Sequence, residues 1–595
     1  MKKIVLASLS AKFIHSSLAL RYLTKFNDNG KKHNLKTMEF TINQRLDFIA
    51  DELFRQQPDV ILFSCYIWNV DLLKQLCPLL KKIMPNCLIG FGGPEVSYES
   101  EVFLKENPAV DLIMRGEGEL VFSEFLDYLD HGTPVSLHEI KSMTFRDGEA
   151  IVSTPQQEPL DLARLPFPYE EDFHDVENQI IYYESSRGCP YSCGYCLSSI
   201  EKGVRFVPLE QVYVALQKFL DHKVRQVKFI DRTFNCKKSH AMGIWQYLQE
   251  HDNGVTNFHF EITADLLDQD TIDFLKTVRK GLFQFEIGVQ STNPKTIEAI
   301  NRNVNFEKLS GIVRQIKAGG NIHQHLDLIA GLPYEDYASF GRSFNDVYAL
   351  EPEQLQLGFL KVLKGSMIYH RQHDFSIVYQ DTAPYEVLTT HMLPYEDTLR
   401  LKAIEEMVET YYNSGKFLHT IAYLVPLYES PFAFFEALSK HWIATECHYQ
   451  YQSKVGLCNI LYAFVQQNEK VDFTRFQWLL KFDLALHEKP KKLPEWLLVN
   501  NERQYHTQLN SFYRVKEVVD HYLPHYSSID SKITARQTHL EVFGSQKQVA
   551  VLFDYDHKDL LQNAACTVIP LEELAQAEEK LKAEMKAQKQ VQHKE

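Results

Sequence analysis

Three cysteines stand close together in the segment SSRGCPYSCGYCLSS, at a spacing that suits a metal centre: Cys189, Cys193 and Cys196. A zinc site needs four ligands, and no second CxxC or CxxH pair lies nearby. A redox pair made of Cys193 and Cys196 would leave the first cysteine unexplained. A [4Fe–4S] cluster is fully ligated by four thiolates, so three cysteines leave one iron open. An open iron suits a catalytic cluster better than an electron carrier.

The other seven cysteines are scattered singly along the chain, at Cys65, Cys77, Cys87, Cys236, Cys447, Cys458 and Cys566. The N-terminal stretch MKKIVLASLSAKF has a short apolar part that ends at Lys12, so it predicts a buried first strand rather than a signal peptide. No apolar run approaches the roughly 18–20 residues that span a bilayer. We therefore expect a cytoplasmic protein with reduced cysteines and no membrane segment.

The composition is that of several globular domains. The chain has 595 residues, of which 45% are hydrophobic and 24% are charged. Lysine and arginine total 63 against 78 for aspartate and glutamate, a net charge of -15. A protein that grips nucleic acid usually has the opposite balance. The substrate is therefore expected to be a small molecule rather than a nucleic acid.

Residues 1–135 alternate short apolar runs with amphipathic helical stretches, which indicates a doubly wound α/β domain with a parallel sheet. Such sheets bind ligands beyond the carboxyl ends of their strands. Small residues follow the predicted strands there: Ser64, the pair Gly92 and Gly93, and the GEGE turn that starts at Gly116. Each glycine alone is explained by a tight turn, but their recurrence at successive strand ends favours a ligand site.

The remaining chain is expected to hold a linker and two further domains. Residues 136–178 are proline-rich with little periodicity and predict a linker, whereas 179–370 repeat βα units and predict a partial or complete barrel. Residues 371–595 predict a mainly α-helical domain with two late strands, HLEVFGSQ and VAVLFDYD, and a polar helix or tail at the end. Polar residues recur at the ends of the barrel strands, at Asp231, Glu261, Glu286, Gln290 and Asp327.

The motif CxxxCxxC, just after the first strand of a βα barrel, resembles the radical S-adenosylmethionine (SAM) signature. The match includes Tyr195 before the third cysteine, and the runs FEIGVQSTNP and DLIAGLPYE resemble later strands of such barrels. The resemblance implies that Cys189, Cys193 and Cys196 hold a [4Fe–4S] cluster. It also implies that the open iron binds the amino and carboxylate groups of SAM. Transfer of one electron then cleaves SAM to methionine and a 5′-deoxyadenosyl radical.

The same resemblance suggests cofactor contacts for four other residues. Tyr195 would meet the adenine of SAM, and Asp231 stands where the family places a motif for the methionine amino group, although the usual glycine pair is missing. Glu261 is a candidate ribose contact, and Gln290 lies on the strand near the adenine. The alternative for each is a strand-end residue that caps a neighbouring helix.

The N-terminal domain resembles the cobalamin-binding domain of B12-dependent radical SAM proteins. Ser64 and the pair Gly92 and Gly93 match the second and third parts of the cobalamin fingerprint, although Tyr66 replaces a small aliphatic residue. The first part, DxHxxG, is absent, so bound cobalamin should lack a histidine ligand on its lower face. His15 is the nearest substitute by position, but a histidine with a local hydrogen-bond partner is the favoured interpretation. The alternative is a domain that has lost cobalamin.

Together with GFLKVLKGSMIY after the barrel, the chain resembles uncharacterised bacterial B12-domain radical SAM proteins that carry a C-terminal domain of unknown function. This implies SAM cleavage with cobalamin-dependent methylation of an unactivated carbon, served by an electron donor of the flavodoxin or ferredoxin type. The alternatives are radical rearrangement, oxidation or methylthiolation without methylcobalamin, and a non-enzymatic corrinoid or redox sensor.

Overall fold

The computed structural model describes residues 2–27, 33–130, 136–170, 172–176, 178–200, 203–491, 493–497, 501–545, 547–558 and 563–592. The chain forms two compact units, Met1–Glu353 with Leu357–Thr398, and Gln354–Gln356 with Leu399–Glu595. Within the described residues, no helix combines the length and the apolar character needed to cross a membrane.

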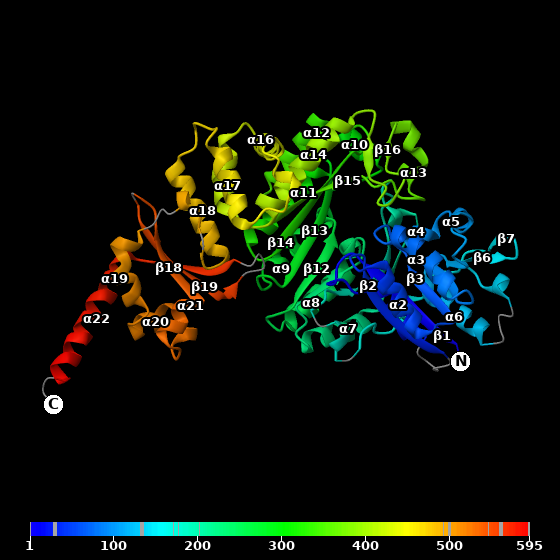
Figure 1. Ribbon diagram of the computed structural model, residues 1–595, viewed down its shortest axis with the longest axis horizontal. Coiled ribbons are helices and arrows are strands. Elements are labelled where there is room, and N and C mark those ends of the chain that lie inside the picture. The colour runs from blue at the N-terminus through cyan, green and yellow to red at the C-terminus, as the bar shows by residue number, and fades with distance from the viewer. Residues whose placement is uncertain are drawn as a thin grey trace. The chain divides into compact units, whose positions relative to one another are not determined.

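The first unit begins with a seven-stranded sheet in the order β2-β1-β3-β4-β5-β6-β7, drawn in blue and cyan in Figure 1. The pairings that join β2, β1, β3, β4 and β5 are parallel. Its parallel strands are β1 (Lys3–Ser10), β2 (Asn34–Thr41), β3 (Val60–Ser64), β4 (Leu88–Gly92) and β5 (Leu112–Met114). The helices between and after them are α1 (Leu18–Phe26), α2 (Leu46–Gln56), α3 (Val70–Ile83), α4 (Pro94–Ser97), α5 (Ser100–Glu106) and α6 (Gly118–Leu129).

Strand β1 shows why the first apolar run is continuous rather than alternating. Its side chains point to opposite faces in turn. Ile4 and Leu6 lie in a core with residues of α1 and α6, whereas Val5 and Ala7 lie in a second core with residues of α2, α3 and α5. Helices cover both faces, so each position of the strand is apolar. The doubly wound α/β prediction is confirmed.

The segment predicted as a linker, 136–178, contributes two strands that the sequence pattern did not indicate. Strands β6 (Met143–Asp147) and β7 (Ala150–Ser153) form an antiparallel hairpin that extends the sheet beside β5. The exposed and half-buried side chains of β7 carry no apolar alternation, as expected for a strand at a sheet edge. The prediction of a plain linker was therefore wrong for these residues, and the limits of the domains stay a prediction.

A second, six-stranded sheet follows in the order β15-β14-β13-β12-β11-β8. Its strands are β8 (Ile181–Tyr183), β11 (Gln226–Phe229), β12 (Asn257–Ile262), β13 (Phe283–Gln290), β14 (His323–Ala330) and β15 (Gln354–Phe359). The pairings from β8 to β14 are parallel, and helices α7 (Leu209–Asp221), α8 (Lys238–Glu250), α9 (Gln269–Leu275), α11 (Phe306–Gly319) and α12 (Tyr337–Tyr348) alternate with the strands. Because β8 and β15 remain edges, this is a partial barrel, as predicted.

Aromatic side chains fill the space between this second sheet and its covering helices. Phe260 packs against Phe229 and Phe283, with ring centroids 4.7 and 5.6 Å apart, and Trp245 of α8 is fully buried against them. The opposite side of the same strands carries polar residues such as Glu261. The alternation therefore leaves the inner side of the partial barrel available for chemistry.

The second unit is mainly helical and contains one small antiparallel sheet, β18-β19-β20, shown in orange and red in Figure 1. The two predicted late strands are β18 (Thr538–Phe543) and β19 (Val549–Lys558), and β20 (Ala564–Ile569) is additional. The predicted C-terminal helix is α22 (Leu571–Gln592). The other helices of this unit include most of α14 (Tyr395–Met407), then α15 (Leu418–Leu424), α16 (Pro431–Ala444), α17 (Lys454–Val465), α18 (Phe473–His487), α19 (Glu502–Phe512), α20 (Lys516–Tyr522) and α21 (Ser531–Gln537).

Candidate active site

Small residues form a row across the carboxyl end of the first sheet. Ser8 of β1 is the register partner of Ser64 in β3, and Ser64 is the partner of Gly92 in β4. Ser8 is buried, and its hydroxyl has no hydrogen-bond partner among the described residues. The structure therefore brings together two residues that the sequence singled out, Ser64 and Gly92, and adds Ser8.

Gly92 and Gly93 are glycines for different reasons. Gly93 has φ +113°, and a Cβ there would lie 2.5 Å from the carbonyl oxygen of Cys65, so internal packing requires a glycine. At Gly92, a Cβ would meet only the Met114 carbonyl oxygen, at 3.6 Å. Of these two glycines, Gly92 is therefore the one with free space where its side chain would be, and a ligand can approach the backbone there.

A cavity of about 710 Å³ opens over this row and extends to the second sheet; we call it the interdomain cavity. Its lining includes strand-end residues of both sheets, namely Ser8, Ser64, Gly92, Glu184, Arg232 and Glu261. Parallel α/β sheets bind ligands beyond the carboxyl ends of their strands. The fold therefore turns the ligand-binding ends of two sheets toward one shared space.

Two stacked aromatic rings line the same cavity. Tyr66 and Trp68 follow β3, and their rings are parallel within 7° with centroids 4.3 Å apart. The Trp68 indole Nε1 donates to the carbonyl oxygen of Leu9, at 3.1 Å. Tyr66, which stands where the cobalamin fingerprint has a small aliphatic residue, thus forms a fixed aromatic wall of the cavity together with Trp68.

His15 lines the cavity, and its imidazole makes a hydrogen bond to a residue of the second sheet. Its Nδ1 lies 2.6 Å from the hydroxyl of Tyr182 in β8. Burial, followed by the charges of Lys12 and Lys228, lowers the pKa of the His15 imidazole, which favours the neutral ring. The imidazole thus has a hydrogen-bond partner, but that partner lies 167 positions away and is not local in sequence. That His15 does not ligate cobalt stays a prediction.

The three cysteines lie on one loop, which we call the cysteine loop, that begins at the end of β9 (Ser186–Cys189). Strand β10 (Gly203–Phe206) pairs antiparallel with β9, and Gly203 is the register partner of Cys189. Gly188 has φ +97°, and a Cβ there would collide with the Gly203 carbonyl, so the hairpin requires this glycine. The hairpin therefore holds the first cysteine in place next to β8.

Arg302, which the sequence analysis did not single out, lies against the cysteine loop. Its Nη1 donates to the Cys193 thiol at 3.6 Å and to the Tyr195 hydroxyl at 3.1 Å, and its Nη2 donates to the Gly288 carbonyl oxygen. Burial raises the pKa of the Cys193 thiol, and the guanidinium opposes that effect. The Nε of Arg302 is buried without a partner among the described residues. The arginine is distant in sequence and carries no local motif that marks it.

Tyr195 is half-buried in an apolar cluster rather than free. Its ring packs with Leu360, Val362 and Ile368, which belong to the segment after the barrel. The Ile368 amide donates to the Gly194 carbonyl oxygen at 2.9 Å. Residues that follow the barrel thus fix Tyr195 within the cysteine loop. The contact of Tyr195 with the adenine of SAM stays a prediction.

Asp231 supports the beginning of the cysteine loop. It is 1% exposed, and its oxygens accept from the Ser185 amide at 2.9 Å and from the hydroxyls of Ser185 and Ser186, at 2.7 and 2.5 Å. Burial raises the pKa of Asp231 to about 6 despite these bonds. The carboxylate is thus occupied by the turn after β8, which does not favour the contact with SAM predicted for it. That contact stays a prediction.

Glu261 and Gln290 occupy the polar side of the second sheet. Glu261 lines the interdomain cavity, and burial, followed by the neighbouring Glu286 carboxylate, raises its pKa to about 7. Gln290 has φ +71° at a register shift between β13 and β14, and its Oε1 is buried without a partner among the described residues. A strained polar residue with an unused acceptor is typical of a ligand site.

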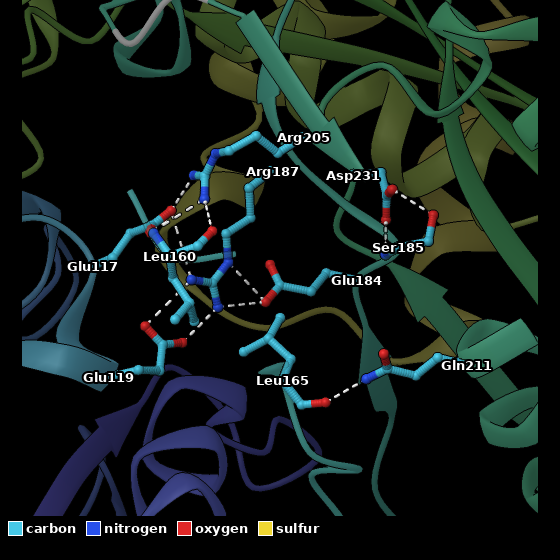
Figure 2. A network of polar contacts seen from close by, with 10 residues as sticks. All are labelled: Glu117, Glu119, Leu160, Leu165, Glu184, Ser185, Arg187, Arg205, Gln211 and Asp231. Atoms are coloured by element: carbon cyan, nitrogen blue, oxygen red, sulfur yellow. Dashed lines mark hydrogen bonds and ion pairs between the residues drawn. The ribbon is translucent and has the colours of Figure 1, made fainter. Parts of the chain in front are cut away.

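A buried charge network connects the two sheets (Figure 2). Arg187 of β9 donates to Glu119 at 2.6 and 3.2 Å and to Glu184 at 2.7 and 3.0 Å. Arg205 of β10 pairs with Glu117 and also donates to the Leu160 carbonyl oxygen at 2.6 Å. Glu117 and Glu119 belong to the GEGE turn after β5, so that turn is anchored to the hairpin that carries the cysteine loop.

The segment 361–387, which we call the bridging segment, contacts both the cysteine loop and the first sheet. The Met367 methyl occupies the space that a Cβ at Gly194 would need. The Tyr369 hydroxyl donates to Glu99 at 2.9 Å, and the Tyr385 hydroxyl donates to the buried Glu95. Glu95 and Glu99 lie just after Gly93, so this segment links the cysteine loop to the strand-end glycines.

Comparison with known families gives three matches in consecutive parts of the chain. The B12 binding domain matches residues 4–126, the Radical SAM superfamily matches 183–347, and a protein family of unknown function, DUF4080, matches 373–561.

Curated relatives and a solved structure are similar to large parts of the chain. The cobalamin-dependent radical SAM methyltransferase TokK of Streptomyces tokunonensis is 29% identical over 317 residues, 48% of this chain and 44% of that protein. The 2-(S-pantetheinyl)-carbapenam-3-carboxylate methyltransferase of Streptantibioticus cattleyicolor is 27% identical, with the same coverage. The chain thus spans less than half the length of these two relatives. The cobalamin-dependent SAM radical enzyme OxsB has a similar fold, with TM-score 0.59, 15% identity, and coverage of 89% of this chain and 84% of that one.

The chain is therefore a radical SAM protein with a B12-binding domain. More particularly, it belongs with the B12-binding radical SAM proteins that carry a C-terminal DUF4080 domain, as the sequence predicted. The radical SAM match implies a [4Fe–4S] cluster and SAM, and the B12-binding match implies cobalamin. These are the three predicted cofactors.

The residues present fit these groups. One loop presents three free thiols at a spacing that suits three of the four iron ligands of a [4Fe–4S] cluster. Beyond the first sheet, the unpartnered hydroxyl of Ser8 and the open side of Gly92 suit a polar ligand that approaches the backbone.

Proposed function

We propose that this enzyme is a cobalamin-dependent methyltransferase that acts on an unactivated carbon of a small-molecule substrate. When bound, the cluster and SAM supply a 5′-deoxyadenosyl radical that removes a hydrogen atom, and cobalamin supplies a methyl group. The observation that carries the proposal is the interdomain cavity, because the strand ends of the B12-binding sheet and of the radical SAM sheet line the same space. The two curated relatives named above, both methyltransferases, support the same reaction class.

In this proposal, each element of the site has one task. Cys189, Cys193 and Cys196 ligate the cluster, and the buried Arg302 guanidinium stabilises the thiolate form of Cys193 through its charge. The unpartnered Nε of Arg302 leaves a donor for the SAM carboxylate. Glu261 faces the cavity as a carboxyl group that can hydrogen-bond the ribose.

The first sheet would hold the cobalamin tail over its small strand-end residues. Ser64 and Gly92 allow the backbone to be approached closely, whereas the stacked Tyr66 and Trp68 form an apolar wall beside them. Gly93 supports the loop from behind through its close contact with Cys65. Exclusion of water from this space protects a radical from side reactions.

Methylthiolation is less well supported, because it needs a second cluster. Cys65, Cys77 and Cys87 are the cysteines of the first sheet region, and all three lie in one apolar core with exposures of 0%, 1% and 4%. Burial raises the pKa of Cys77 and Cys87, the latter to about 11, so these thiols stay protonated. A protonated thiol is a poor metal ligand.

A cyclisation or oxidation without methyl transfer is the second candidate. The anaerobic magnesium-protoporphyrin IX monomethyl ester cyclase of Synechocystis is 23% identical over 365 residues, 56% of this chain and 69% of that protein. This match covers a larger share of both proteins than the two methyltransferase matches do, which is the observation that favours this alternative.

The test is anaerobic reconstitution with iron, sulfide, cobalamin and SAM whose methyl group is deuterated, followed by mass spectrometry of a treated cell extract. Radical SAM enzymes require a reductant, and we propose a flavodoxin or ferredoxin as the physiological donor; dithionite serves in the test. A product that carries the labelled methyl group supports the proposal. Formation of 5′-deoxyadenosine together with a product that lacks the label would favour the second candidate instead.

A further inference from the structure

Arg187 occupies a special position in the charge network of Figure 2. It lies in β9 two residues before Cys189, the first cysteine of the loop. Its side chain reaches Glu119 at the start of α6, in the B12-binding domain, and Glu184 at the end of β8, in the barrel. One guanidinium thus joins the two domains directly beside the cysteine loop.

The chemistry of the side chain suits this task. The exposed fractions of the Arg187, Glu119 and Glu184 side chains are 15%, 6% and 8%. A planar guanidinium can donate to two carboxylates at once, which a lysine ammonium cannot do with the same geometry. Because the partners are buried, the loss of one contact leaves a charge without compensation. The position of Arg187 is therefore tied to both carboxylates together.

The same three residues line the interdomain cavity. A ligand that fills this cavity displaces water from the network and strengthens its electrostatic contacts. A change in the position of Glu119 would then be passed to Arg187, and through the β9 backbone to Cys189. This path consists of one side-chain contact and two peptide units.

We propose that Arg187 is a positioning residue that couples occupancy of the cobalamin site to the conformation of the cysteine loop. This inference rests on the proposed function, because it takes cobalamin to bind in the interdomain cavity and the cluster to bind at the cysteines. The coupling is a free energy between two sites, so it is reciprocal: the cluster must favour cobalamin by the same factor as cobalamin favours the cluster.

The test measures cobalamin affinity rather than turnover. The dissociation constant for hydroxocobalamin is determined anaerobically for the full chain, without the cluster and after reconstitution of the cluster. We expect the reconstituted wild-type protein to bind about tenfold more tightly, within the usual range of coupling between sites. Glu119→Gln removes the charge that accepts both interdomain hydrogen bonds of Arg187. It leaves Arg187 with Glu184 and with the longer ion pair to Glu117, at 3.6 Å, so this ratio should fall to about twofold or less.

A matched control is Arg279→Lys. Arg279 donates to Asp252 at 2.6 and 3.1 Å within the barrel and does not line the cavity, so the ratio should stay as in the wild type. Arg187→Lys is the second variant if Glu119→Gln does not fold, and it should lower the ratio as well. The electron paramagnetic resonance spectrum of the reduced cluster should change on cobalamin addition in the wild type and in Arg279→Lys. It should not change in Glu119→Gln or in Arg187→Lys.

The possible results separate the inference from the proposed function. A wild-type ratio near one, with cobalamin and four irons both bound, would overturn the coupling and leave the proposed function intact. A tenfold ratio that persists in Glu119→Gln and in Arg187→Lys would also overturn the role of Arg187. A wild-type protein that binds no cobalamin would overturn both.

Discussion

The guanidinium of Arg302 lies 3.6 Å from the thiol of Cys193, although 109 positions separate the two residues in the chain. The same guanidinium contacts Tyr195, so one cation supports two residues of the cysteine loop. A buried positive charge beside a thiol favours the thiolate, which is the form that ligates iron. Because the same guanidinium also donates to the Gly288 carbonyl oxygen, the contact connects the loop that carries the three cysteines to β13 of the radical SAM domain.

Arg302→Ala should lower the rate of 5′-deoxyadenosine formation by about 10²-fold, the usual cost of losing one preorganised donor in an active site. Arg302→Lys keeps the positive charge but not the planar guanidinium. Its rate of 5′-deoxyadenosine formation should lie between the rates of the wild type and of Arg302→Ala. The measurement is product quantification by liquid chromatography under saturating reductant. Activity in the alanine variant equal to that of the wild type would exclude a role for this contact.

Cys193→Ala should lose the cluster and with it all reductive cleavage of SAM, because only three thiols are available to it on the loop. Iron content and the absorption band of the cluster measure the loss. Cys566→Ala, at an exposed cysteine of the second unit, is the matched control. Cys236→Ala is a sharper one, since the Cys236 thiol lies near enough to Asp231 and Cys189 for their charges to raise its pKa, with burial as the largest cause. Loss of iron in the Cys236 variant would contradict ligation by three cysteines alone.

Gly92→Leu should reduce cobalamin retention and leave the cluster spectrum unchanged, because the new side chain enters open space at the strand end. Retention is read from the absorbance of the purified holoenzyme. Gly311→Leu, on α11 with no heavy atom within 4 Å of its Cβ position, is the control for a bulky side chain elsewhere. Gly93→Leu is not a useful variant, since it collides with the Cys65 backbone and destabilises the domain itself. Normal retention in Gly92→Leu would place cobalamin elsewhere.

Glu261 makes the stability of the cofactor-free protein depend on pH. Burial, and then the Glu286 carboxylate, raise its pKa from 4.5 to about 7. Between these pH values the folded protein keeps a proton that the unfolded chain has lost. The contribution of Glu261 to the free energy of unfolding is therefore fully present below about pH 4.5, declines as pH rises, and is lost as pH passes through about 7. We expect Glu261→Gln to remove this decline, which amounts to at most about 3 kcal/mol. Urea unfolding at several pH values measures it, with Glu250→Gln on the surface of α8 as control; equal slopes for Glu261→Gln and wild type would contradict the assignment.

His15 should not ligate cobalt. The chain lacks the DxHxxG motif that would carry the ligating histidine. The hydrogen bond of His15 Nδ1 to the Tyr182 hydroxyl ties the ring to β8 of the barrel. The electron paramagnetic resonance spectrum of the Co(II) form should therefore show no splitting from a protein nitrogen, in the wild type and in His15→Ala alike. Splitting that disappears in His15→Ala would identify this histidine as the lower ligand.

Much of the site follows from local patterns in the sequence. The spacing of the three cysteines, the small residues Ser64 and Gly92, and the continuous apolar run of β1 are all features of adjacent residues. Each follows from a short-range rule about ligand spacing, strand ends or burial on both faces.

The residues that the sequence did not reveal depend on tertiary pairing. Ser8 joins the site only because β1 lies beside β3 in a fixed register. Arg187 and Arg302 contact partners 68 and 109 positions away in the chain. Other arginines, such as Arg45 with Asp47, form exposed ion pairs, so residue type alone does not mark a site. The hairpin of β6 and β7 was missed because edge strands with exposed side chains carry no periodic apolar signal.

The bridging segment 361–387 sets a limit on modularity. It follows the radical SAM barrel in the chain, yet its tyrosines hold Glu95 and Glu99 of the B12-binding domain, and its Ile368 amide holds the cysteine loop. A recombinant fragment that stops at the last barrel strand would therefore contain every predicted cofactor ligand. It would still lack the segment that contacts both the B12-binding domain and the cysteine loop. For the same reason, a chimera that grafts this B12-binding domain onto another barrel would need to carry residues 361–387 with it.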